Sequence, residues 1–249
     1  MKKEKKKVNK RTVLLLILSL VLLTGLIVGL VCLIRGCDQE PVVEPEQTPD
    51  QTEPSSQAPI VEDTSTDLGK GMKLVRIGEY TGAYVEDGTD EVVSGVLMIV
   101  VKNTGEEAIQ YAEISLPVAD GSAQFTVSTL MPGASVVLLE KSRMAYTGQE
   151  QPELAVADTV AVFHETPSLC QDRLQLQTLD GAINVTNISG EDITGDVLIY
   201  YKNYTAGLYY GGITYRVRIE GGIGAGEIKQ IMASHFSASG SEIVFVTIG

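Results

Sequence analysis

The clearest hydrophobic pattern in the chain begins near residue 72 and continues to the C-terminus. Runs of five to twelve residues rich in Val, Ile and Tyr alternate with polar residues and end at Gly, Asn or Asp. This alternation is typical of antiparallel β-strands that bury one face. It predicts strands over 92–103, 108–118, 135–141 and 158–163. Because six or seven short strands in about 90 residues are typical of a sandwich, the expected fold class is all-β.

Two halves of this β region resemble each other. Val101-Lys102-Asn103 is followed by an alternating strand that begins near Ile109, and Val185-Thr186-Asn187 is followed at the same spacing by Ile193. An Asn at a strand end tolerates tight turn geometry, so these repeated residues are interpreted as structural markers. A second pair of turn segments, at 130–133 and 223–226, precedes an apolar strand in each half.

The repeat predicts two tandem antiparallel β-sandwich (Ig-like) domains, at 71–166 and 167–249. The markers lie further apart in the second unit, by about nine residues. We expect this extra length in a hairpin near 204–212. Each unit ends in an apolar strand, at 160–163 and 243–246.

The second half resembles the FxLYD-type and related immunoglobulin-like modules of bacterial surface proteins. The resemblance rests on Asn187, Ile193, the alternating strand 197–202 and the turn at Gly226-Glu227. The Phe-x-Leu-Tyr-Asp string itself is absent, and the sequence Ile-Tyr-Tyr-Lys-Asn stands in its place. Such modules share no activity, so the resemblance implies a fold and no chemistry.

Residues 12–34 are 23 consecutive residues without a charge, enough for a helix to cross a bilayer. The basic residues of 1–11 precede this predicted transmembrane helix. By the positive-inside rule, the N-terminus is expected in the cytoplasm and the C-terminal domains outside the cell. The alternatives are a cleaved signal peptide, for which the apolar run is long, and a lipoprotein signal ending at Cys37, where Arg35 departs from the pattern.

Residues 35–70 are acidic and contain five prolines, so this segment is predicted to be a disordered stalk. The charge is divided unevenly along the chain. The first 35 residues carry eight Lys and Arg against one Glu, whereas the remainder carries 11 basic and 31 acidic residues. A strongly acidic body repels phosphate backbones, so nucleic acid is not an expected partner.

The residues that usually perform catalysis are scarce. There are two histidines and three cysteines, and His164 and His235 fall in different units. No nucleophile elbow or metal-ligand spacing accompanies them, so we expect neither an enzyme nor a metal site. The run 87–91 is interpreted as an acidic turn, not a calcium loop. The glycines of 222–226 lack the third glycine of a dinucleotide loop, so no cofactor is expected.

Tyrosine is concentrated in one segment, with six of the ten between positions 200 and 215. Because side chains alternate faces along a strand, one residue of each adjacent pair is expected to point outward. The candidate binding patch is Tyr201, Tyr204, Tyr209 and Tyr210. The alternative is cross-strand pairing that only stabilises the hairpin.

These observations lead to a functional hypothesis. The chain is predicted to be a membrane-anchored surface protein whose β-sandwich domains bind a protein or an envelope polymer. The alternative is a structural or accessory subunit of a membrane complex, engaged through its transmembrane helix.

Overall fold

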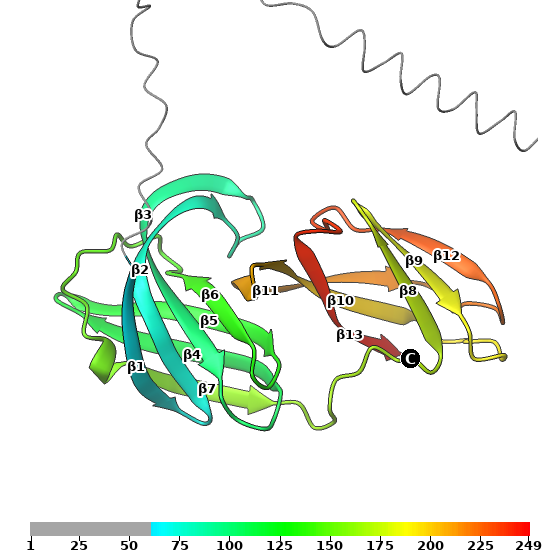
Figure 1. The fold of residues 1–249 in the computed structure, drawn as a ribbon, viewed down its shortest axis with the longest axis horizontal. Coiled ribbons are helices and arrows are strands. Elements are labelled where there is room, and N and C mark those ends of the chain that lie inside the picture. The colour runs from blue at the N-terminus through cyan, green and yellow to red at the C-terminus, as the bar shows by residue number, and fades with distance from the viewer. Residues whose placement is uncertain (1–60) are drawn as a thin grey trace, which may run out of the picture. The chain divides into compact units, whose positions relative to one another are not determined.

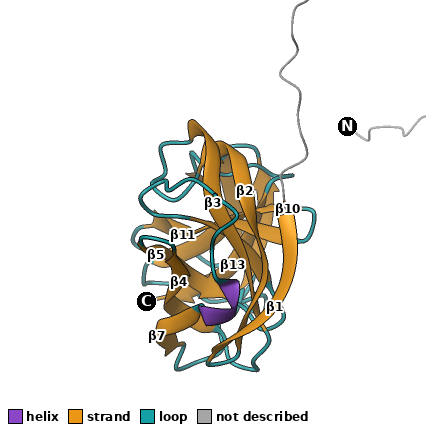
Figure 2. Ribbon diagram, turned by 90° about the vertical axis from the view of Figure 1, so that its left-hand side faces the viewer, coloured by secondary structure: helices purple, strands orange, loops and turns teal. Residues whose placement is uncertain are grey.

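The computed structural model describes residues 61–249, so the predicted membrane helix at 12–34 and most of the predicted stalk lie outside the described residues. Within 61–249 no helix has the length and apolarity needed to cross a bilayer. Figure 2 shows that strands dominate this region. The elements are β1 (Val61–Gly69), β2 (Met72–Tyr84), β3 (Glu91–Asn103), β4 (Ile109–Val118), β5 (Gly121–Leu130), β6 (Ser135–Leu139), η1 (Pro152–Leu154), β7 (Val156–Val162), β8 (Leu174–Leu179), β9 (Ala182–Asn187), β10 (Val197–Thr205), β11 (Leu208–Ile219), β12 (Ile228–Met232) and β13 (Ser241–Ile248).

The first half of the described chain, residues 61–163, packs two layers of strands around one core. One layer holds β1, β2, β3 and β6 in that order, and the other holds β5, β4 and β7. The alternating apolar residues of β3 and β4 meet between the layers, where Leu97, Ile99 and Ile114 are almost completely buried around Phe125. This burial supplies the main driving force for the fold of this half.

The second half, residues 174–249, repeats this arrangement. In Figure 1, β8, β9 and β12 form one layer, and β10, β11 and β13 form the other. The pairings β8–β9, β9–β12, β10–β11 and β10–β13 reproduce β2–β3, β3–β6, β4–β5 and β4–β7 of the first half. The strand order of the second half therefore repeats that of the first.

Tight turns have the residues that their geometry requires. The β10–β11 hairpin turns at Ala206-Gly207, and both residues have positive φ, at 51° and 87°. This is the type I′ geometry that matches the twist of paired strands. The hairpin lies where the extra length of the second unit was predicted, so that prediction is confirmed.

Strand β3 is buried on both sides, which explains its unbroken apolar run from Val96 to Val101. Leu97 and Ile99 face the core between the layers, whereas Met98 faces a second apolar cluster on the other side of the sheet. That second cluster is completed by Leu208 and Tyr210 from the β10–β11 hairpin. The second half thus covers a sheet face of the first.

A parallel pair of strands joins the two halves. Tyr209 and Tyr210 of β11 pair with Val136 and Val137 of β6, so one seven-stranded sheet runs β1-β2-β3-β6-β11-β10-β13. Pairing within each half is antiparallel, as predicted, and this parallel pair lies between the halves. Parallel pairing arises here because the two strands belong to different halves and need no hairpin between them.

The structure also corrects the N-terminal boundary of the β region. The predicted disordered stalk extended to residue 70, but residues 61–69 form β1, which pairs with β2 in the antiparallel direction. The strands predicted at 92–103, 108–118, 135–141 and 158–163 are confirmed as β3, β4, β6 and β7, with ends shifted by one or two residues. The division into domains at residues 166 and 167 stays a prediction.

Candidate functional site

The predicted tyrosine patch is not an outward surface. Tyr201 is 2% exposed and Tyr209 is 6% exposed, and each belongs to an apolar core. Tyr204 and Tyr210 are half-buried and pack against the cores. The expectation of outward tyrosines is therefore wrong. It assumed that one face of the β10–β11 hairpin meets solvent, whereas Tyr201 packs in the core of the second half and Tyr209 in the core of the first.

The tyrosine rings pair with one another and with nearby aromatic residues. Tyr201 stacks on Tyr215 with ring centroids 5.3 Å apart, and Tyr204 meets Tyr209 at 5.2 Å across the hairpin. Tyr200 stacks on Phe245 of β13 at 4.1 Å. Such pairs stabilise a hairpin beyond the burial of their area. The alternative interpretation of the tyrosines, cross-strand stabilisation, fits this geometry.

A buried lysine lies beside this cluster, where the halves meet. The side chain of Lys202 is 0% exposed, and its Nζ donates to the carbonyl oxygens of Ile213 at 2.7 Å and Ser128 at 2.9 Å. Ser128 belongs to β5 of the first half. Burial lowers the pKa of Lys202 from 10.5 to about 7, and the Glu86 carboxylate opposes part of this shift.

Glu86 and Lys202 both bind the backbone of Gly212. The Glu86 carboxylate accepts hydrogen bonds from the backbone N–H of Gly212 at 2.7 Å and of Leu139 at 2.9 Å, and burial raises its pKa. The carbonyl oxygen of Gly212 accepts from Lys202 Nζ at 3.3 Å. A lysine with a lowered pKa is a potential nucleophile, but this one is enclosed by carbonyl oxygens and reaches no solvent. The arrangement therefore joins the halves.

The acidic turn at 87–91 is occupied by protein groups. Asp87 accepts from the backbone N–H of Thr89 at 2.9 Å, and Arg143 forms ion pairs with Asp87 at 3.0 Å and Glu91 at 2.7 Å. These contacts lower the pKa of Asp87, first through Thr89 and then through Arg143. Among residues 61–249 no three His, Cys, Asp or Glu side chains are placed to hold a metal.

The two histidines lie where the halves meet and in the connection between them. His235 stacks on Tyr215 with centroids 4.9 Å apart, and its Nδ1 lies 3.4 Å from the Asp90 carboxylate in the first half. His164 lies just after β7, in the connection between the halves. These positions give His235 a role in contact between the halves.

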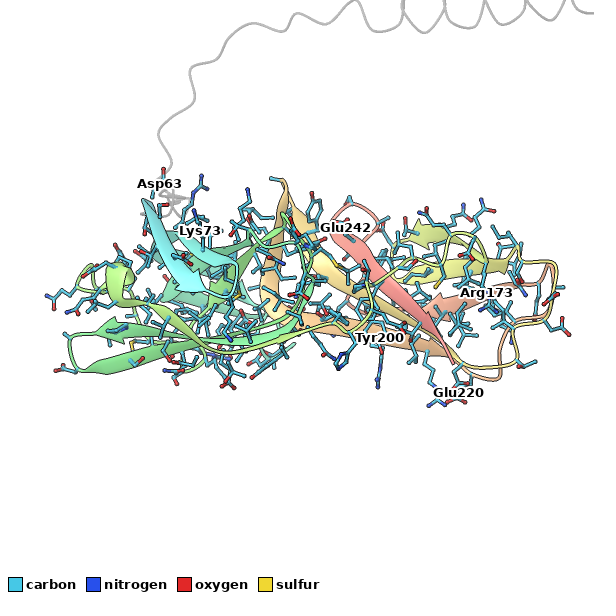
Figure 3. All side chains as sticks on the ribbon, turned by 90° about the horizontal axis from the view of Figure 1, so that it is seen from below. Asp63, Lys73, Arg173, Tyr200, Glu220 and Glu242 are labelled. Carbon is cyan, nitrogen blue, oxygen red and sulfur yellow. The ribbon has the colours of Figure 1, made fainter. Side chains whose placement is uncertain are left out.

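An open groove of about 500 Å³ lies between β8 and β13, and we call it the β8 groove. Its apolar lining comes from Leu169, Leu174, Leu176, Ile188 and Ile243, with Gln175, Thr178 and Glu242 at polar positions. Figure 3 labels Glu242 on β13. Ile188 is 49% exposed, so the apolar wall continues to the surface.

Sequence reasoning missed the β8 groove. The segment 174–179 alternates Leu with Gln or Thr, which is an ordinary strand signal. The segment differs from other strands because one of its sides has no neighbouring strand among the described residues. The sequence of one segment does not show which strands will lie beside it. A comparison of the residues that precede β2 and β8 could have indicated the difference, because only the first half has a strand there.

No protein-family model matches the chain, and no curated protein matches it.

Proposed function

We propose that this chain is a membrane-anchored, extracytoplasmic surface protein whose tandem β-sandwich domains bind another protein and perform no catalysis. The β8 groove is the main observation in support of this proposal. It places an open apolar surface next to a strand, β8, whose outer side has no neighbouring strand in the described chain. A polypeptide can satisfy both features at once, because it offers apolar side chains together with backbone hydrogen bonds.

The placement outside the cell rests on the sequence. The uncharged run 12–34 follows a basic N-terminus, and the acidic, proline-rich segment after it suits a tether. The resemblance to FxLYD-type modules supports the same setting, since those modules belong to bacterial surface proteins.

A protein ligand is favoured over a wall polymer by the lining of the groove. Sugar-binding surfaces usually present flat aromatic rings, and the chain has no Trp. The aromatic residues of the second half are engaged in its core or in the junction. The groove offers aliphatic side chains and strand backbone instead.

The test uses the full-length chain in lipid nanodiscs, mixed with envelope fragments of the source organism before and after protease treatment. We expect saturable binding that protease treatment abolishes. Binding that survives the treatment would make the ligand a polymer, and the absence of binding would reject the proposal. Protease added to intact cells should remove an epitope at the C-terminus, and its protection would contradict an extracellular location.

A helix-exchange variant addresses the alternative of an accessory subunit. Residues 12–34 are replaced by an unrelated membrane helix of equal length. Binding through the β8 groove should be unchanged, whereas recruitment to a complex through the helix would be lost.

A further inference from the structure

The free side of β8 lacks the usual protection of an edge strand. In the described chain, β8 pairs with β9 only and ends the three-stranded sheet. Edge strands are normally guarded by charge, proline, a bulge or a covering segment. The strand 174–179 has neither charge nor proline, and its ladder with β9 runs without a register shift. This edge is therefore open to another strand.

β8 is the counterpart of β2. Met72 pairs with Asn103 and Leu174 pairs with Asn187, the repeated asparagine of the second half. Two residues further along, Leu74 pairs with Val101 and Leu176 pairs with Val185, again at equivalent positions. The outer side of β8 thus corresponds to the outer side of β2.

In the first half, β1 occupies that outer side. β1 runs antiparallel to β2, and its Leu68 is 4% exposed in the core of the first half. β1 also contacts β7, the counterpart of β13. Figure 1 shows β1 alongside β2, and β8 at the end of its layer. The β8 groove between β8 and β13 is therefore the place that β1 takes between β2 and β7.

Part of this place is already filled by the connection between the halves. The carbonyl oxygen of Ser168 accepts a hydrogen bond from Val246 N at 2.8 Å, and Cys170 packs against the core of the second half. The open part lies beside residues 175–178. At about 3.3 Å per residue, it accommodates an added strand of about five residues.

We propose that the partner protein adds an extended strand antiparallel to β8, in the place that β1 takes in the first half. This inference rests on the proposed function, that the groove binds a protein. The inward positions of β1 alternate through Thr64, Thr66 and Leu68, so the added strand carries small or aliphatic residues at alternate positions.

Charge indicates what kind of strand fits. In the first half, Asp67 lies opposite Lys73 and Asp63 opposite Arg76, and the Arg76 Nε donates to Asp63 at 3.0 Å. Asp63 and Lys73 are labelled on this strand pair in Figure 3. Gln175 is the counterpart of Lys73, and Gln177 is the counterpart of Arg76. β8 therefore lacks the charges that match an acidic strand, and Glu242 at the groove disfavours one further. The added strand is neutral or basic.

The same charges argue against a second copy of this chain. Its β1 is acidic and already pairs with its own β2. Two copies each carry a net charge of −13, so they repel each other. The occupant is a different protein.

The first experiment measures peptide binding to the full-length chain in nanodiscs by fluorescence anisotropy. The probe is the neutral-to-basic peptide Thr-Leu-Lys-Leu-Thr-Val-Lys, compared with a peptide of the β1 sequence VEDTSTDLG. The wild-type chain should prefer the first peptide, with hydrogen-exchange protection of β8. The exposed double substitution Gln175→Lys and Gln177→Arg copies the charges of β2. It should strengthen binding of the β1 peptide about tenfold. Unchanged preference, or binding without protection of β8, would overturn the inference.

The second experiment removes a backbone donor from the free edge. The hairpin pairing of Leu179 with Ala182 directs the N–H of Thr178 away from β9, so Thr178→Pro removes a donor for the added strand and retains the ladder. Thr178→Ala is the matched control, and circular dichroism verifies that both variants fold.

Thr178→Pro should lose binding to the envelope partner at least tenfold, and Thr178→Ala should retain it. If wild type and Thr178→Pro bind the partner equally, strand addition is wrong and the proposed function stands. If wild type binds no envelope protein but β8 is protected by the peptide, the proposed function fails and the groove chemistry stands. A dimer in sedimentation that Thr178→Pro abolishes would make the occupant a second copy and overturn the choice of partner.

Discussion

Asn187 repeats the hydrogen bonds of Asn103, 84 positions earlier in the chain. In each case Nδ2 donates to the carbonyl oxygen four residues later and to the carbonyl oxygen of a residue beside the glycine turn, while Oδ1 accepts from the N–H two residues later. The partners are Glu107, Leu130 and Gly105 in the first half, and Glu191, Ile223 and Ser189 in the second. Asn103 thus connects the end of β3 to the end of β5 in the opposite layer. Asn187 connects the end of β9 to Ile223, which follows β11 in the opposite layer.

Loss of this amide should destabilise the protein. Asn187 is completely buried, so Asn187→Ala leaves the carbonyl oxygen of Ile223 and the N–H of Ser189 without a side-chain partner. We expect the free energy of unfolding to fall by about 3 kcal/mol, measured by urea denaturation of the full chain. Asn184→Ala on the same strand is the control, because Asn184 is half-exposed and its side-chain hydrogen bonds lie at the surface, where water can replace them. Equal effects of the two substitutions would contradict the structural role.

Lys202 should make stability depend on pH. Its pKa is about 7 in the folded protein against 10.5 for the free side chain, so the unfolded chain binds more protons between these values. The free energy of unfolding should therefore rise from pH 7 to about pH 10. Above pH 10 the opposite trend begins, because burial raises the pKa of Tyr84 and of Tyr215 to about 12.

The measurement is the urea midpoint at pH 7, 8 and 9.5. Lys202→Met should flatten the rise, and Lys102→Met, at an exposed site on β3, should leave it intact. A wild-type midpoint that does not rise over this interval would show that the amine is hydrated in the folded protein.

Tyr201 should prove to be a core residue. Tyr201→Ala removes a ring that stacks on Tyr215 and meets Phe236 edge-on at 5.1 Å. We expect a loss of about 4 kcal/mol in the free energy of unfolding, typical of a large core aromatic replaced by alanine. Tyr201→Phe retains the ring and should cost only about 1 kcal/mol. If Tyr201→Ala kept full stability and lost partner binding, the original patch hypothesis would be restored.

Gly212 should tolerate no side chain. A Cβ at this position would overlap the carbonyl oxygen of Thr126 in β5. Gly212→Ala therefore has to separate β11 from β5, and it should lower the midpoint of thermal unfolding by about 10 °C. Gly240→Ala is the control, because its nearest neighbour, Ser237, lies at an ordinary 3.6 Å. Calorimetry of the full chain measures both. Equal unfolding midpoints for Gly212→Ala and Gly240→Ala would show that β11 and β5 can move apart at little cost in stability.

Much of the fold was predictable because local pattern and turn residues agree. The alternation of 92–103 and the terminal Asn103 define β3 from the sequence alone. β1 was missed because its acidic composition resembles that of the preceding segment. In the structure, Asp63 of β1 pairs with Arg76, and Leu68 of β1 packs in the core of the first half. The pattern of residues within β1 does not indicate either contact.

The candidate site was not predictable for a related reason. Tyr209 is buried in the core of the first half, a contact between the halves that no periodicity encodes. The β8 groove exists because a strand present beside β2 has no counterpart beside β8. The absence of a strand beside β8 produces no pattern in the sequence of β8, so it can be recognised only from the strand order of the sheet.

The parallel pair β6–β11 affects how this protein can be divided. A fragment that ends near residue 166 would leave the outer edge of β6, with Val136 and Val137, without its strand partner. It would also uncover Leu139 and the cluster that Tyr210 helps to close. Such an apolar edge invites association between fragments. The first half therefore depends on the second to cover this edge and this cluster.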